Sequence, residues 1–341
     1  MYRVGKFPDG CSILGDKATG EFFTVYDVFS KYTLNSENVL VDPKPFFVVE
    51  NQIAHGHNGG GITTIHKSNK KKTMILYAVG DCLPYGTTGM HAPQLDSETC
   101  GKILAINIAG KGDFKIVAKG IRNPQQFQHS KKGNKLYFMD IGGVTAEEVN
   151  AIKLKNLMYP RSNKQLPNFG WGRNIHDGKA REGTFYMGPG DAGILSTEPP
   201  CEEKAPSPDP GYIQPWIQFG RSAQDAYYAI SGFAVPEINV DKVKLIFTEF
   251  NTGYLMGTTR KFRNGKGVVK SHKFKMYYDG EEVKSINDVT AIEMNTTSTR
   301  CDPRMYTHTD GSAGLFVERS GAYYKLSEIE LNENKDYYSR V

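Results

Sequence analysis

A histidine and a carboxylate stand at the ends of two neighbouring segments in the first quarter of this sequence. His57 lies in a glycine-rich loop, and Asp81 follows Gly80 at the end of the apolar segment 74–79. Glycines beside both residues would allow another backbone or a flat ligand to approach closely. A histidine that can accept a proton, with a carboxylate to orient it, is the minimum for general-base catalysis. The alternative is that His57 and Asp81 are ordinary turn residues, because Asp and Gly are common in turns.

The elements that must position these residues are short apolar segments separated by turns. They predict strands at residues 22–29, 45–50, 73–79, 102–108, 114–118, 135–140, 149–153, 244–250, 254–258, 273–278, 289–294, 314–318 and 322–326. No amphipathic helix is evident. Groups of strands return about every 45 to 60 residues, which is typical of the blades of a β-propeller. The loops at one end of a propeller converge on its axis, which would bring the loops of His57, Asp81, Arg122 and Gly142 together.

The bulk properties favour one soluble all-β domain covering residues 1–341. Residues 172–226 are rich in Gly, Pro and acidic residues and have little periodicity, so we interpret them as inserted loops on one face. The formal net charge of +5 is small for this length, and the lysine clusters fall between strands, where solvated hairpin tips are expected. No basic helix or stacking-aromatic motif accompanies them, so nucleic acid is not an expected partner.

The sequence leaves the cell compartment open. No apolar run approaches the ~20 residues that a membrane span requires. The N-terminus lacks the apolar core of a signal peptide, so the protein is either intracellular, or extracellular or periplasmic if a leader precedes Met1. Five cysteines form no CxxC pair, which argues against a zinc site. Cys82 and Cys100 flank one loop and could form a disulfide. Trp171 and Trp216 are interpreted as packing residues.

Six short motifs occur in a recognisable order. They are HNGGGI from His57, LYAVGD ending at Asp81, GKILAINI from Gly101, GIRNPQQF from Gly120, FMDIGG with EEVNAI across residues 138–152, and NFGW from Asn168. Together they resemble the glucose/sorbosone dehydrogenase family, which includes soluble PQQ-dependent sugar dehydrogenases and the propeller domain of hedgehog-interacting proteins. The resemblance implies a six-bladed β-propeller with its active site on the axis. We count about five strand groups, so either residues 1–20 contribute closing strands or the propeller lacks or rearranges the first blade.

The resemblance also implies roles for individual residues. His57 corresponds to the general base that removes a sugar hydroxyl proton while hydride passes to PQQ, and Asp81 corresponds to the acid that orients it. Arg122 corresponds to an arginine beside the quinone, where a cation would stabilise the developing negative charge. Asn123 lies next to Arg122 in the same turn and is expected to contact the cofactor.

Calcium is the metal that the resemblance implies. Gly142 and Gly143 fall where backbone carbonyls hold the calcium ion that polarises PQQ, and calcium favours such oxygen ligands. Glu147 and Glu148 fall where acidic residues build a second, structural calcium site in some members of the family.

Three departures from the family pattern weaken the expected cofactor site. Ile141 stands where the PQQ dehydrogenases have a glutamine, residues 230–236 contain no basic residue, and residues 285–289 lack the paired arginines of the family. PQQ carries three carboxylates, and an unpaired anion in a partly dry site is costly.

Three functions therefore remain open. The first is an oxidoreductase that oxidises a sugar or another alcohol with PQQ and calcium. The second is a non-enzymatic propeller that binds a protein or a glycan, which the missing cations favour. The third is another reaction on the same scaffold, such as metal-assisted hydrolysis.

Overall fold

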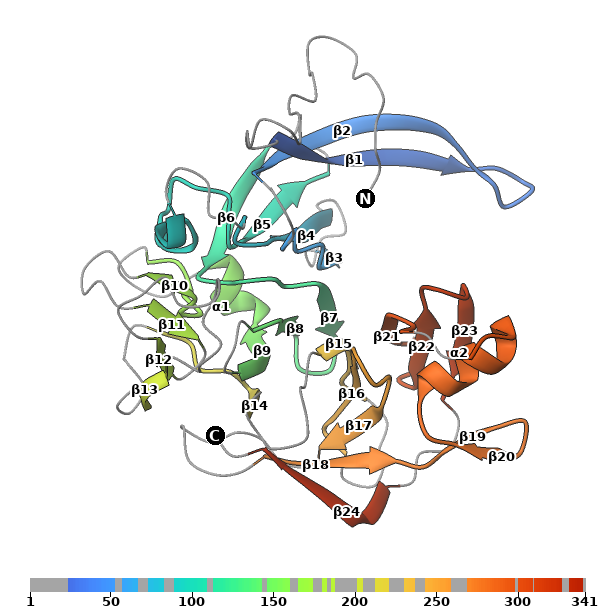
Figure 1. Cartoon of the computed structure of the whole chain (residues 1–341). Helices are drawn as coiled ribbons and strands as arrows, with labels where there is room; N and C mark the ends of the chain where they lie inside the picture. The colour runs from blue at the N-terminus through green and yellow to red at the C-terminus, as the bar shows by residue number, and fades with distance from the viewer. Residues whose placement is uncertain are drawn as a thin grey trace, which may run out of the picture.

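The computed structural model shows an almost entirely antiparallel β-protein in the residues that it describes (Figure 1). These are residues 24–52, 57–66, 73–82, 89–108, 113–142, 146–159, 165–173, 180–182, 185–187, 201–204, 212–220, 230–236, 243–258, 269–297, 300–308, 310–326 and 331–339. The helices among them are α1 (Leu154–Met158), α2 (Ile286–Met294) and the 3-10 helix η1 (Gly89–Gln94). None of these helices is long and apolar enough to cross a membrane. The all-β prediction is confirmed.

Four sheets follow one another along the chain in the manner of propeller blades. The first contains β3 (Ile62–His66), β4 (Thr73–Val79), β5 (Lys102–Asn107) and β6 (Phe114–Lys119). The second contains β7 (Gln126–Ser130), β8 (Lys135–Asp140), β9 (Ala146–Lys153) and β14 (Ile217–Gly220). The third contains β15 (Ile230–Ala234), β16 (Leu245–Glu249), β17 (Leu255–Thr258), β18 (Val269–Phe274) and β24 (Leu331–Ser339). The fourth contains β21 (Pro303–Thr307), β22 (Ala313–Val317) and β23 (Ala322–Lys325).

Three smaller sheets complete the described structure. A long hairpin joins β1 (Thr24–Leu34) to β2 (Leu40–Gln52), and a short one joins β19 (Met276–Tyr278) to β20 (Glu281–Val283). The third is formed by β10 (Gly172–Arg173), β11 (Ala180–Glu182), β12 (Phe185–Met187) and β13 (Cys201–Lys204).

The core consists of apolar layers between consecutive sheets. Alternating side chains of each strand point to opposite faces, so each sheet contributes to the layer on either side of it. Leu76 and Ile103 of the first sheet pack with Phe138 of the second, and equivalent layers join the second sheet to the third and the third to the fourth. The β1–β2 hairpin covers the other face of the first sheet, where Phe47 packs near Tyr77. This stack fixes the order hairpin, first, second, third and fourth sheet.

The innermost strands of the four sheets lie next to one another in chain order. β3 contacts β7, β7 contacts β15, and β15 contacts β21. The side-chain amide of Gln126 on β7 ties three of these strands together, because its nitrogen donates to the carbonyls of Phe233 and Met305 and its oxygen accepts from the Phe233 amide. This order of inner strands is that of a propeller. Six blades stay a prediction, since the part of the chain that the structure describes holds four blade-like sheets, and residues 1–20 lie outside it.

Two sequence predictions about local structure are wrong. Residues 289–294 were expected to form a strand, yet they belong to α2, because Ser285 and Asp288 cap its first turn: the Ser285 hydroxyl oxygen accepts from the Asp288 amide at 3.3 Å. Residues 172–226 were expected to be inserted loops, yet their described parts contain the β10–β13 sheet and β14. Short strands of two to four residues carry too little periodicity to be recognised.

We predict that Gln126→Leu lowers the free energy of unfolding by about 2–4 kcal/mol, since it leaves backbone groups of two neighbouring sheets without their partner. Urea denaturation measures this change. Gln165→Leu, at an exposed position, is the matched control and should change stability by less than about 0.5 kcal/mol. Equal stability of both variants would show that the axial hydrogen bonds of Gln126 do not hold the sheets together.

Candidate functional site

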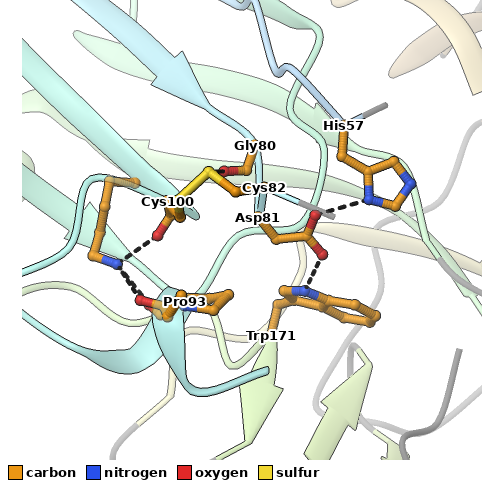
Figure 2. Close-up of a disulfide and its surroundings, with 9 residues drawn as sticks. His57, Gly80, Asp81, Cys82, Pro93, Cys100 and Trp171 are labelled. Atoms are coloured by element: carbon orange, nitrogen blue, oxygen red, sulfur yellow. Dashed lines mark hydrogen bonds and ion pairs between the residues drawn. A yellow bond between two sulfur atoms is a disulfide. The ribbon is translucent and has the colours of Figure 1, made fainter. Parts of the chain in front are cut away.

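His57 and Asp81 form a hydrogen-bonded pair at the end of the first sheet where β3 begins and β4 ends (Figure 2). Nδ1 of His57 lies 2.8 Å from Oδ1 of Asp81. The Asp81 side chain is fully buried, whereas the His57 side chain is 17% exposed. The pair joins a buried carboxylate to an imidazole that solvent or a small molecule can reach.

Glycine makes this approach of two backbone segments possible. A Cβ atom on Gly80 would collide with the carbonyl oxygen of His57, and one on Gly59 would collide with the carbonyl oxygen of Ala78. Gly60 donates to the Ala78 carbonyl at 2.9 Å, and Ala78 donates back to Gly61 at 2.8 Å. The glycine-rich loop therefore lies directly against the end of β4, as the sequence suggested.

Trp171 holds the second oxygen of the Asp81 carboxylate. Its indole Nε1 donates to Oδ2 of Asp81 at 2.8 Å, and its side chain is buried. Sequence reasoning interpreted Trp171 as a packing residue and missed this contact, although the residue ends the NFGW motif. Gln94 of η1 in turn donates to the Trp171 carbonyl at 2.6 Å. With one oxygen on Trp171 and the other on His57, the carboxylate has a single defined orientation.

Arg122 adds a cation to the same group. Its guanidinium lies over the Trp171 ring, 5.2 Å from the centroid, and its Nη1 donates to the carbonyl of Ile141 at 2.8 Å. The Arg122 carbonyl accepts from the Asp81 amide at 2.7 Å. Nε of Arg122 is buried and makes no hydrogen bond within the described part of the chain. The structure thus brings the three predicted catalytic residues, His57, Asp81 and Arg122, to one place.

Asp140 and Asn123 support the turn that carries Arg122. The backbone amides of Arg122 and Asn123 donate to the Asp140 carboxylate, at 2.9 and 2.6 Å. Burial raises the pKa of Asp140 to about 7, although these amides and the Arg122 charge act in the opposite direction. The Asn123 side-chain oxygen accepts from the Gly59 amide at 3.2 Å. Asn123 therefore links the Arg122 turn to the His57 loop, and its expected contact with a cofactor stays a prediction.

The predicted calcium ligands are only partly placed by the structure. Gly142 is buried at the end of the loop after β8, and Gly143 lies outside the described residues. Glu147 and Glu148 are both buried in β9. As consecutive strand residues they point to opposite faces of the second sheet, so one ion between the sheets could use only one of them. Within the described ranges, no group of three or more His, Cys, Asp or Glu side chains is arranged to hold a metal ion.

A disulfide and a buried lysine connect Cys82, η1 and the start of β5. Cys82 and Cys100 are bonded, as the sequence allowed. The ammonium group of Lys102, which sequence reasoning missed, donates to the carbonyls of Ala92, Pro93 and Cys100 at 2.8, 3.1 and 2.6 Å. Burial lowers the pKa of Lys102 to about 7, and nearby Lys119 acts in the same direction. These contacts attach η1, and through it Trp171, to the start of β5.

The arrangement defines how His57 can act chemically. A carboxylate facing Nδ1 favours the tautomer that carries its proton on Nδ1, because an ionised Asp can only accept. Nε2 then has a lone pair with which to accept a proton from a ligand. Asp81 would stabilise the imidazolium that results.

Comparison with solved structures finds this fold in sugar dehydrogenases. Two structures described as glucose dehydrogenase superpose with a TM-score of 0.51 each, at 13% and 14% sequence identity, and the matches cover 90% and 92% of this chain and 77% and 81% of theirs. The apo form of the soluble aldose sugar dehydrogenase from Escherichia coli also has a TM-score of 0.51, at 15% identity, over 91% of this chain and 79% of its own.

These likenesses show a shared fold, and at that level they confirm the resemblance that the six motifs carry. No family model matches the chain, and no curated protein matches its sequence.

We predict that Trp171→Phe loosens the orientation of the His57 ring, because it removes the donor to Asp81 while keeping a ring beneath Arg122. The loss of one buried hydrogen bond should also lower the free energy of unfolding by about 1–3 kcal/mol. NMR relaxation of the imidazole carbon-bound protons measures the first effect, and urea denaturation measures the second. Trp216→Phe is the matched control, since Trp216 packs against Tyr137 in a different layer, and should leave the relaxation of the His57 ring unchanged. Unchanged relaxation in Trp171→Phe would contradict the positioning role.

We predict that Lys102 makes stability rise with pH in the alkaline range. The pKa of Lys102 is about 7 in the folded chain against 10.5 for a free lysine, so between these values the unfolded chain binds the proton more strongly. Burying the neutral amine therefore carries no penalty above pH 10.5. As the pH falls from 10.5 to 7, the free energy of unfolding decreases, because the unfolded chain takes up the proton first. Between these limits the parent should gain up to about 1.4 kcal/mol per pH unit over Lys102→Met.

Urea denaturation across pH 7 to 10 measures this difference in slope. Lys153→Met, at an exposed position, should follow the parent. Parallel stability curves for the parent and Lys102→Met would show that the buried amine keeps its ordinary affinity for the proton.

Proposed function

We propose that this chain is an oxidoreductase that oxidises a sugar or another alcohol, with His57 as the general base. The observation that carries the proposal is the pair of His57 and a fully buried Asp81, whose second oxygen is held by Trp171. A carboxylate bonded on both oxygens cannot turn away, so it keeps the imidazole ring in one orientation. The fold shared with glucose dehydrogenases supports a catalytic role for the His57–Asp81 pair.

The chemistry follows from the atoms present. Oxidation of an alcohol to a carbonyl compound removes the hydroxyl proton and a hydride from the same carbon. Nε2 of His57 would accept the proton, and Asp81 would stabilise the charged ring. The hydride must pass to an acceptor. The Arg122 guanidinium, held between Trp171 and the Ile141 carbonyl, is the described cation placed to stabilise negative charge there.

PQQ with calcium is the acceptor that the family resemblance proposes, and the described residues fit it in part. Nε of Arg122 is a buried donor without a hydrogen bond in the described ranges. It could donate to a carboxylate or carbonyl oxygen of a ligand. The other positions that hold PQQ in the family do not carry residues that fit it. Ile141 replaces a glutamine, and β15 is buried along its whole length without a basic residue. Ser285 and Asp288 are occupied in capping α2. We therefore derive no step through PQQ and treat it as a ligand to be tested.

The second candidate function is a propeller that binds a protein or a glycan without catalysis. The specific observation that favours it is the absence of the family's cations from β15 in the third sheet and from the start of α2. Under this alternative the His57–Asp81 pair would only stabilise the glycine-rich loop, and removing the imidazole would leave ligand binding intact.

The first test is calorimetric titration of the calcium-loaded chain with PQQ, beside Arg122→Ala and Arg122→Lys. Binding by the parent that weakens at least about tenfold in the alanine variant, with lysine between them, would support PQQ as the acceptor, because Arg122 is the described cation beside the His57–Asp81 pair. Circular dichroism melts show whether each variant is folded. Absence of binding at every calcium concentration would exclude PQQ as the acceptor.

Activity provides the second arm of the test. With a dye as the final electron acceptor and a panel of aldoses, His57→Gln should lower kcat by about 10²–10⁴-fold, since a general base contributes that much. PQQ binding with no turnover of any sugar would favour the binding propeller over the enzyme.

A further inference from the structure

The fourth sheet carries an aromatic cluster on its solvent-facing side, far along the chain from His57. Residues i and i+2 of a strand share a face, so Arg304, Tyr306 and the following His308 align along β21. The register pairs Tyr306 with Gly314 and Gly314 with Lys325, and pairs Phe316 with Tyr323. The opposite face bears Met305, Leu315 and Val317, which are buried against the third sheet.

Three rings of this cluster hold one another in a fixed geometry. Tyr306 and Tyr323 stack with their ring centroids 5.0 Å apart and an angle of 21° between planes, and His308 meets both rings edge-on. The Tyr323 hydroxyl lies 2.8 Å from Nε2 of His308. Tyr323 nevertheless remains 53% exposed, and Phe316 beside it is 37% exposed.

Packing of the sheet explains only part of this cluster. The Tyr306 ring lies across Gly314, where a Cβ atom would collide with it, and an aromatic ring over a strand glycine is a known way to stabilise a sheet. That accounts for Tyr306, whereas the second ring, Tyr323, stacks on Tyr306 and stays open to solvent. The Tyr306 hydroxyl is buried and has no hydrogen-bond partner among the described residues.

The charges around the rings are fixed in pairs. Nζ of Lys325 lies 2.7 Å from Oδ2 of Asp310, whose second oxygen accepts from Ser312, and Arg304 faces Glu318 at 3.7 Å. The Lys325 pair holds the pKa of Asp310 well below its usual range. Lys325 and Arg304 thus each face a carboxylate. These two pairs add no net charge beside the rings, and they offer hydrogen-bond donors and acceptors.

We propose that the face formed by Tyr306, His308, Phe316 and Tyr323 is a binding site for a neutral oligosaccharide, separate from the His57 site. The outer face of the Tyr323 ring, held in place by Tyr306 and His308, offers a flat apolar surface for the C–H face of a pyranose at little cost in side-chain entropy. The flanking Asp310–Lys325 and Arg304–Glu318 pairs supply hydrogen bonds to hydroxyl groups around the ring. The site would hold a glycan chain against the fourth sheet whether or not the His57 site is catalytic.

The test is calorimetric titration of the folded chain with cellohexaose and maltohexaose, and with hexagalacturonate as the anionic counterpart. We expect one neutral hexasaccharide to bind and Tyr323→Ala to weaken it at least about tenfold. Tyr323→Phe keeps the ring and should stay within about threefold of the parent. Tyr277→Ala is the matched control, because Tyr277 is 63% exposed on the β19–β20 hairpin, outside the cluster.

The outcomes separate the two sites. Binding that persists in His57→Ala and falls in Tyr323→Ala places the glycan on the fourth sheet, whatever the result of the activity assays. Binding that is lost in His57→Ala and kept in Tyr323→Ala overturns the proposal. So does a failure of both neutral sugars to bind at millimolar concentration, or a preference for hexagalacturonate.

Discussion

The close approach of two backbone segments at Gly80 and His57 is the constraint on which the rest of the site depends. The carbonyl of His57 occupies the space that a side chain on Gly80 would fill. His57 itself has a positive φ of 58°, a conformation that costs a non-glycine residue about 1–3 kcal/mol. The hydrogen bonds between the glycine loop and Ala78 offset this cost. Asp81 follows Gly80 directly, so the same contact that strains His57 also places the carboxylate beside its ring.

From this contact a continuous set of interactions runs into the next sheet. Asp81 is bonded to Trp171, Trp171 lies beneath Arg122, and the Arg122 turn is held by Asp140 at the end of β8. The first and second sheets share one apolar layer, and the His57 loop and the Arg122 turn are hydrogen-bonded to the ends of these sheets. These contacts hold the imidazole in one orientation, as a general base requires.

The sequence allowed the fold class and the polar pair to be predicted, because both depend on local features. Apolar segments alternate with turns, and His57 and Asp81 each end a segment beside glycine. The partners that complete the site were not predictable in this way. Trp171 is 90 residues from Asp81 in sequence, and a lone tryptophan resembles any core residue until the fold brings it there. The burial of Lys102 was not predictable, because two of its three carbonyl partners lie in the short helix η1, which has no periodicity to announce it. Helix α2 was missed since its β-branched residues suggested a strand, although Ser285 and Asp288 form a capping box.

The residues that depart from the family pattern have structural roles in this chain. Among the residues that the structure describes, the groups in contact around His57 come from the first two sheets and the segment carrying Trp171. In the third sheet, β15 is buried throughout and an unpaired lysine there would be costly. Beyond it, residues 285–288 begin and cap α2. Arg122 is the cation that these contacts place beside the His57–Asp81 pair. An anionic group of a ligand would therefore be stabilised best where it faces Arg122.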